Sequence, residues 1–251
     1  MHTTSPLRTS IRTLATQAFA YGAVLLAALT VSRVARAQAF PLSGRVSGAI
    51  HLQVTDPRGE FSQNTGHGFG VGVSGILRGD QHGVINLRTD LSLITYGTST
   101  RRIPFANTGG LVKLDLRTTS SIVSLVVGPQ IGGTAGPVSM YVAGLAGFSV
   151  FWTESSVEGS SNNNNQPFAS TTNASDAALA YGASAGGTFR VYNGQRPVRL
   201  DFGARYLRHD DATYLNEARV QDAFSNNRDP IPLRGRADFV TYYVGANVVL
   251  F

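Results

Sequence analysis

The 251-residue chain contains no cysteine, and only 14% of its residues are charged. The missing cysteine excludes disulfides, a lipid-anchored N-terminus and thiolate chemistry. Histidine is sparse, at five residues, and no two histidines have the spacing of a metal-ligand pair, so a zinc site is not expected. Beyond the N-terminal region, no apolar run reaches the roughly 20 residues that a membrane-spanning helix needs. These absences leave either a soluble protein of an oxidising compartment or a β-barrel.

A strong charge of one sign is also missing once the N-terminus is set aside. Residues 1–37 hold four arginines and no acid, so the formal net charge of +6 falls to +2 for 38–251, with 17 basic and 15 acidic residues. The N-terminal segment has basic residues at Arg8 and Arg12, an apolar core and an A-x-A pattern, which together predict a secretory signal peptide cut after Ala37 or Ala39. The charge of the remainder gives no reason to expect nucleic-acid binding.

What the chain has in abundance is alternation between apolar and polar residues. In the last fifteen residues, the even positions from Val240 to Leu250 are apolar or aromatic, whereas Thr241, Gly245 and Asn247 are small or polar. A period of two predicts a β-strand with one apolar face. Ending on such a strand is typical of outer-membrane barrels, whose last strand closes on the first. Similar alternation predicts seven earlier strands, at about 45–55, 67–78, 85–93, 111–131, 138–152, 179–191 and 198–206.

The connections between these strands alternate strictly in length. Tight turns rich in Gly, Asn and Pro occupy Gly79–Gly83, Gly133–Pro137 and Asn193–Pro197. Outer-membrane barrels alternate short periplasmic turns with longer outer loops. The sequence therefore predicts an all-β fold, an eight-stranded antiparallel up-and-down transmembrane β-barrel over residues 38–251. The longer polar segments would be its outer loops, at 56–66, 97–110, 154–176 and 216–236.

The fourth predicted strand breaks the alternation. Its even positions are apolar in 111–117, but its odd positions are apolar from Ser121 onward. Two interpretations stay open: a β-bulge near Thr118–Ser121, or a charged first half that stands above the membrane. A soluble lipocalin-like barrel would turn its apolar faces inward. Arginine and aspartate in the middle of the polar faces, mixed with Gly and Ser, favour a narrow polar lumen and an apolar outer wall.

Together, the signal peptide, the loop rhythm and the C-terminal pattern make the chain similar to the outer membrane protein β-barrel superfamily, the OmpA/OmpX-like eight-stranded barrels, over about 38–251. This resemblance implies a location in the outer membrane of a Gram-negative bacterium, in contact with outer-membrane lipid and lipopolysaccharide. It also implies the barrel assembly machinery as a partner during insertion, because the C-terminus is similar to the signal that this machinery reads. The family usually ends on an aromatic where Leu250 stands. The residues of this assembly signal would be Tyr243, Gly245, Val248, Leu250 and Phe251.

An eight-stranded barrel encloses room only for side chains or one small ligand. Charges in such a space are costly unless they are paired, so we expect the inward charged residues to form a network that plugs the lumen. The predicted function is a structural or surface-interaction role, with no catalysis, cofactor or metal; a narrow porin-like channel for small solutes is the alternative. The network would consist of Arg88, Asp90, Arg190, Arg199, Asp201 and Arg205.

A lipid A-modifying enzyme is a second alternative that the resemblance raises. The lipid A deacylases have a His-x-Ser motif, but here the serine two residues after His209 is missing. The lipid A palmitoyltransferases use a His, Asp and Ser set near the outer rim, to which His67 or His209 would belong. Because nucleophile, base and orienter cannot all be named, no enzyme is predicted.

Recognition at the cell surface would be carried by the long loops, as is common for loops on a rigid scaffold. The sequence names no surface ligand. Basic residues in or near the predicted outer loops are expected to pair with lipopolysaccharide phosphates. They are Arg58, Arg101, Arg102, Lys113, Arg117, Arg208, Arg219, Arg228, Arg234 and Arg236.

Overall fold

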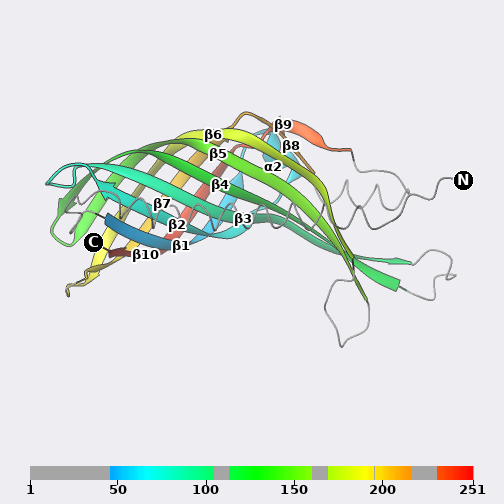
Figure 1. Ribbon diagram of the computed structural model, residues 1–251, viewed down its shortest axis with the longest axis horizontal. Helices are drawn as coiled ribbons and strands as arrows, with labels where there is room; N and C mark the ends of the chain where they lie inside the picture. Colours follow the sequence, from blue (N-terminus) through cyan, green and yellow to red (C-terminus); the bar gives the residue numbers. More distant parts are fainter. Residues whose placement is uncertain (1–45, 105–112, 160–168, 195, 216–230, 251) are drawn as a thin grey trace, which may run out of the picture. The chain divides into compact units, whose positions relative to one another are not determined.

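Eight antiparallel strands close into one barrel (Figure 1) in the computed structural model, which describes residues 46–104, 113–159, 169–194, 196–215 and 231–250. Each strand pairs with its neighbour in the chain, and β1 pairs with β10 to close the barrel. The predicted fold class is therefore confirmed. The barrel strands are β1 Val46–Pro57, β2 Gly68–Arg78, β3 Ile85–Pro104, β4 Lys113–Ala135, β5 Val138–Gly159, β6 Ala169–Tyr192, β7 Val198–His209 and β10 Phe239–Val249.

The alternation seen in the sequence separates an apolar outer wall from a largely polar interior. On β1, Ile50 and Leu52 are 68% and 67% exposed, whereas His51 between them is 2% exposed. The other strands follow the same rule, with Phe69 and Met140 among the most exposed side chains. A soluble barrel would show the opposite arrangement, because its apolar side chains would fill its interior. This wall needs an apolar surrounding, so the barrel is a transmembrane barrel of the outer-membrane type.

The irregularity predicted for the fourth strand lies on its neighbour instead. The register between β3 and β4 shifts between Thr95 and Gly97, so Tyr96 on β3 is the extra residue of the bulge. The even positions of β4 stay buried through the predicted bulge, from Leu116 to Ile122. The apparent change of phase arises because the inward residues Leu116 and Ile122 are apolar, as the outward ones are. The bulge expected near Thr118–Ser121 is therefore wrong.

Four of the barrel strands are longer than predicted. Strands β3 to β6 have 20 to 24 residues each, about twice the 9–11 that cross a bilayer. Residues 97–104 pair with 113–120, so much of the predicted outer loop 97–110 is strand. In the predicted outer loop 154–176, residues 154–159 and 169–176 are strand as well. Their composition is Ser- and Thr-rich without apolar alternation, which is why the sequence suggested loops. The charged start of β4 lies in this extension, in agreement with the interpretation that places it above the membrane.

Three further elements lie in the longer connections, where no helix or strand was predicted. Helix α2, Glu60–Asn64, lies between β1 and β2, and the strands β8, Asp211–Tyr214, and β9, Leu233–Arg236, form a two-stranded sheet between β7 and β10. All three belong to the end of the barrel that carries the longer connections, called the long-connection end below. The opposite end, with the tight turns, is called the short-turn end. No helix in the described part of the chain is long and apolar enough to cross a membrane.

The predicted signal peptide, residues 1–37, lies outside the described residues, and so do 38–45 and Phe251. The division of the chain at Ala37 or Ala39 therefore stays a prediction.

Candidate functional site

Charged side chains from opposite walls meet inside the barrel at Asp90. Nε of Arg88 donates hydrogen bonds to both carboxylate oxygens of Asp90, each at 2.9 Å. Nη1 of Arg205 lies 3.5 Å from Oδ2 of the same carboxylate. Strands β3 and β7 stand four places apart in the closed order of eight strands, so this contact crosses the lumen. All three residues are at most 2% exposed, which makes Asp90 a buried anion held between two guanidinium groups.

The second lumen carboxylate, Asp201, is held by a tyrosine and a histidine. It accepts a hydrogen bond from the Tyr141 hydroxyl at 2.8 Å and lies 3.0 Å from Nε2 of His51. The Tyr141 hydroxyl lies 2.9 Å from the Tyr243 hydroxyl, and the guanidinium carbon of Arg88 lies 4.9 Å from the Tyr141 ring centroid. Cation–π attraction thus links the two halves of the cluster. We call these seven residues the lumen network: His51, Arg88, Asp90, Tyr141, Asp201, Arg205 and Tyr243.

The lumen network contains four of the six charged residues that the sequence pointed to, namely Arg88, Asp90, Asp201 and Arg205. The other two, Arg190 and Arg199, lie at the short-turn end and face each other as Cα partners in the β6–β7 pair. Nη1 of Arg199 donates to Oγ of Ser139 at 3.2 Å, and the described residues show no ion pair of either arginine. These two residues are therefore placed near the network but not joined to it.

Sequence reasoning missed the aromatic members of the network, although one sequence signal for them exists. A Cβ on Gly186 would lie 2.6 Å from the Tyr141 hydroxyl, and a Cβ on Gly203 would lie 2.6 Å from the Tyr243 hydroxyl. Gly203 is the Cα partner of Tyr243 in the β10–β7 pair. A large inward side chain beside a cross-strand glycine is thus given room to cross the lumen. Searching for inward tyrosines opposite glycines would have found Tyr243.

Above the lumen network, toward the long-connection end, the interior holds a cluster of apolar side chains. Phe61 of α2 is fully buried, with its ring centroid 5.3 Å from that of Tyr96 and 5.1 Å from that of Tyr214. The contact with Tyr96 is tilted and that with Tyr214 is edge-to-face, and both add to the gain from burial. We call this cluster the apolar cap. It includes Phe61, Ile94, Tyr96, Ile122, Phe151, Leu207, Ala212, Tyr214, Ala237 and Phe239.

His209 makes a buried pair with a serine. Its Nδ1 lies 2.7 Å from the carbonyl oxygen of Ala237, so that nitrogen donates, and Nε2, 2.8 Å from Oγ of Ser149, accepts. Ser149 and His209 are 0% and 1% exposed beneath the apolar cap. A nucleophile must come within reach of its substrate, and this hydroxyl is enclosed. His67, the other candidate, is exposed and lies 3.3 Å from a carboxylate oxygen of Asp56.

The residues of the predicted assembly signal have structural positions of their own. Tyr243 belongs to the lumen network, and a Cβ on Gly245 would lie 1.9 Å from the carbonyl oxygen of Ile50, so close packing against β1 requires glycine there. The backbone nitrogen of Leu250 donates to the carbonyl of Val46 at 2.8 Å, which joins the chain's last described residue to β1. Val248 pairs with β1 and β7. Their role as a signal stays a prediction, and Phe251 is outside the described residues.

Several of the basic residues expected to meet lipopolysaccharide already pair with carboxylates. The ion-pair distances are 2.6 Å for Arg58–Asp56, 3.0 Å for Arg102–Asp115, 3.8 Å for Arg208–Asp238 and 3.9 Å for Arg234–Asp211. Exposed pairs of this kind are weak, so a phosphate can replace the carboxylate at little cost. Arg219 and Arg228 lie outside the described residues. Within the described part of the chain, no group of three or more acidic, histidine or cysteine side chains is arranged to hold a metal ion.

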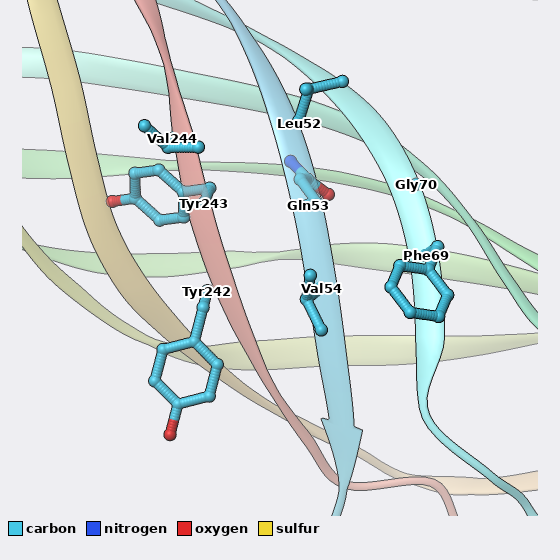
Figure 2. A pocket seen from close by; sticks show the side chains of 8 residues that line it. All are labelled: Leu52, Gln53, Val54, Phe69, Gly70, Tyr242, Tyr243 and Val244. Atoms are coloured by element: carbon cyan, nitrogen blue, oxygen red, sulfur yellow. The ribbon is translucent and has the colours of Figure 1, made fainter.

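An apolar hollow of about 470 Å³ lies on the outer wall rather than in the lumen. Figure 2 shows Phe69 on β2 and Tyr242 on β10 at its two sides, with Val54 of β1 between them. These side chains point outward, and Phe69 and Tyr242 are 67% and 51% exposed. The hollow is therefore a depression in the lipid-facing surface, of a kind that acyl chains fill.

No protein-family model matches the chain, and no curated protein matches it. Among solved structures, it is similar to Neisserial surface protein A, at 14% identity over 82% of this chain and 96% of that chain, with a TM-score of 0.38. It is also similar to Ail, the attachment invasion locus protein of Yersinia pestis, at 16% identity over 81% of this chain and 95% of that chain, with a TM-score of 0.37. A major outer membrane protein from Thermus thermophilus matches at 10% identity over 80% of this chain and 98% of that chain, with a TM-score of 0.34.

The strand order and the polarity of the wall identify the chain as an eight-stranded outer-membrane β-barrel. In Gram-negative bacteria the outer membrane is the membrane that holds barrels of this kind, and the protein is located there.

Proposed function

We propose that the protein is a closed outer-membrane barrel, a rigid scaffold that acts at the cell surface through its long-connection end and conducts no solute. The observation that carries this proposal is the filling of the lumen by two successive layers. The lumen network crosses the barrel from β3 to β7, and the apolar cap lies above it around Phe61. A continuous water path would have to pass both layers.

The energetic cost of opening either layer supports closure. Separating Arg88 and Arg205 from Asp90 would leave buried charges unpaired, and removing one partner from such a pair costs about 3–5 kcal/mol. Withdrawing Phe61 would leave a void among aromatic rings, which for a buried phenylalanine costs a similar amount, about 3–5 kcal/mol. The narrow-channel alternative requires both changes together, since eight strands leave space only for side chains.

A role at the cell surface is supported by the ordered structure at the long-connection end. Strands β3 to β6 continue past the length needed to cross a bilayer and remain paired with one another, so they hold polar residues in fixed positions. Exposed arginines such as Arg58 and Arg102 suit the phosphates of lipopolysaccharide. The barrel assembly machinery remains the proposed partner during insertion, through the strand that ends at Leu250.

Catalysis is not part of the proposal. The two serine–histidine pairs found among the described residues, Ser74–His51 and Ser149–His209, are both enclosed, and the Ser74 hydroxyl donates to Asp90 rather than to its histidine. In the Ser149–His209 pair, the group that orients the histidine is the carbonyl of Ala237 rather than a carboxylate. A lipid substrate outside the wall would not reach it without displacing the apolar cap.

Solute flux into liposomes tests the closed-barrel proposal. Liposomes that contain the refolded protein should swell in a small sugar no faster than protein-free liposomes, at any protein-to-lipid ratio. A large outer-membrane porin in parallel liposomes is the positive control. A swelling rate that increases in proportion to the amount of this protein would favour the channel instead.

A further inference from the structure

Two arginines face each other at the short-turn end of the barrel without a carboxylate between them. Arg190 on β6 and Arg199 on β7 are Cα partners and lie on the inward faces of their strands. Like charges directly opposite on neighbouring strands destabilise a sheet. Arg78, the last residue of β2, is close enough to Arg199 to add a third positive charge. The arrangement is therefore costly unless something negative sits among these groups.

The side chains here have hydrogen-bonding capacity that the described protein groups leave unused. Nε of Arg190 and Nε of Arg199 are both buried atoms without a partner. The Thr188 hydroxyl, on the same face of β6 and two residues from Arg190, is also buried without a partner, in a residue that is 7% exposed. This contrasts with Arg88, whose Nε is satisfied by both oxygens of Asp90. A buried polar group without a hydrogen bond is costly, so these donors point to a ligand that accepts several bonds.

The neighbouring groups restrict what that ligand can be. Ser139 is the Cα partner of Thr188 and already accepts from Arg199, so it extends the polar surface onto β5. Asp201, the next inward residue along β7, is held by His51 and Tyr141 and contacts neither arginine. Two guanidinium groups and a hydroxyl that converge in this way suit a tetrahedral oxyanion, because guanidinium forks bind phosphate oxygens in pairs.

We propose that the short-turn end of the lumen is a binding site for a phosphate-type oxyanion, held by Arg190, Arg199 and the Thr188 hydroxyl. The phosphate is either free in solution or carried by a phospholipid headgroup of the adjacent leaflet. This site is separate from the lumen network and the apolar cap, and it goes beyond the proposed function: a closed barrel can carry it or lack it.

Binding is tested on the full folded chain in a maltoside detergent, which contains no phosphate. The measurement is the urea midpoint of unfolding with sodium phosphate or with sodium chloride at equal ionic strength. Phosphate should raise the midpoint of the wild type more than chloride does. The Arg190→Gln and Arg199→Gln variants should lose this difference. Their affinity for phosphate should fall by about tenfold or more, since each loses a charged hydrogen-bond donor. Arg196→Gln, an exposed arginine in the adjacent turn, is the matched control and should respond as the wild type does.

A second arm separates the two sources of phosphate. Short-chain phosphatidylglycerol in the micelle is compared with inorganic phosphate at the same concentration. A larger shift with the lipid assigns the site to a headgroup, and a larger shift with phosphate assigns it to the free anion; both support the site. In phosphate-free buffer, Arg190→Gln should be at least as stable as the wild type, because it relieves the opposition of like charges. The proposal is overturned if neither probe shifts the wild type, if all four proteins shift alike, or if Arg190→Gln is destabilised without phosphate.

Discussion

Asp90 is the residue on which the contacts of the lumen converge. It receives Arg88 from its own strand and Arg205 from the opposite wall, and the hydroxyl of Ser74 donates to it as well. A carboxylate in this position is stable only because these donors replace the water it has lost. The lumen network therefore depends on this one anion more than on any other group.

Replacing Asp90 by alanine should destabilise the barrel by about 3–5 kcal/mol, because two guanidinium groups would stay buried without their partner. The measurement is the unfolding free energy from urea titration of the refolded protein in lipid. Asp115→Ala on the neighbouring strand β4, which removes the partner of the exposed Arg102, is the matched control and should change stability little. Equal losses for the two variants would contradict a special role for the buried cluster.

At this scale the sequence was informative about charge but not about aromatic residues. Arg88, Asp90, Asp201 and Arg205 could be assigned to the lumen because each alternates with apolar neighbours on a strand. His51, Tyr141 and Tyr243 could not be assigned to a network in this way, since histidine and tyrosine are common on either face of a membrane barrel. Which charges pair across eight strands depends on register, and Arg190 and Arg199 show that inward charges need not join the network.

Among the elements, α2 has an effect out of proportion to its five residues. The helix has no side-chain N-cap and is too short to be stable alone. It persists because Phe61 inserts among Tyr96, Phe151 and Tyr214. Barrel strands could be predicted from the sequence because the membrane requires a period of two. Helix α2 and the β8–β9 pair could not, because a five-residue helix and four-residue strands carry too little periodicity to be seen.

Replacing Phe61 by alanine should cost about 3–5 kcal/mol, because the ring fills the centre of the apolar cap and its removal leaves a cavity. The readout is again the free energy of unfolding in lipid. Phe69→Ala is a suitable control, since Phe69 is the same residue type on the outer wall at 67% exposure, and its loss should be smaller. If the two variants lose the same stability, the cap does not pack as described.

The cost of introducing a charge on the outer wall should depend on its depth in the bilayer. Leu52 lies near the middle of β1 and points outward, so Leu52→Arg should destabilise the protein by about 2–4 kcal/mol. Leu200 also points outward but is only the third residue of β7, near the short-turn end, so Leu200→Arg should cost less. Folding efficiency and unfolding midpoints in lipid vesicles measure the loss of stability in both variants. A larger loss at Leu200 than at Leu52 would mean that the membrane does not lie where the wall indicates.

The whole molecule has two unlike ends, one with tight turns and one with α2, β8, β9 and the extensions of β3 to β6. This polarity was predictable because connection length alternates in the sequence. The apolar cap was not, because the inward apolar residues Leu116 and Ile122 look like a change of strand phase until α2 is known to lie inside. The sequence predicted a plug of charged residues alone, whereas the structure has a lumen network covered by an apolar cap.

The orientation of the two ends can be measured with introduced cysteines, since the chain has none of its own. Gln63→Cys places a thiol on the exposed side of α2, and Gln81→Cys places one on the exposed β2–β3 turn. A membrane-impermeant maleimide added to intact cells should label the first variant and spare the second. Labelling of both after lysis is the control. The reverse pattern in intact cells would place the short-turn end outside.

The central claim, that the lumen is closed, is tested most directly by the current through single refolded barrels in a planar bilayer. Because the lumen network and the apolar cap both cross the water path, the unmodified protein should insert without a steady current above the lipid baseline, in concentrated salt and at either polarity of the voltage. Insertion has to be confirmed independently, for example by protease protection of the same preparation. A large and steady conductance from the unmodified barrel would contradict the account and establish a pore.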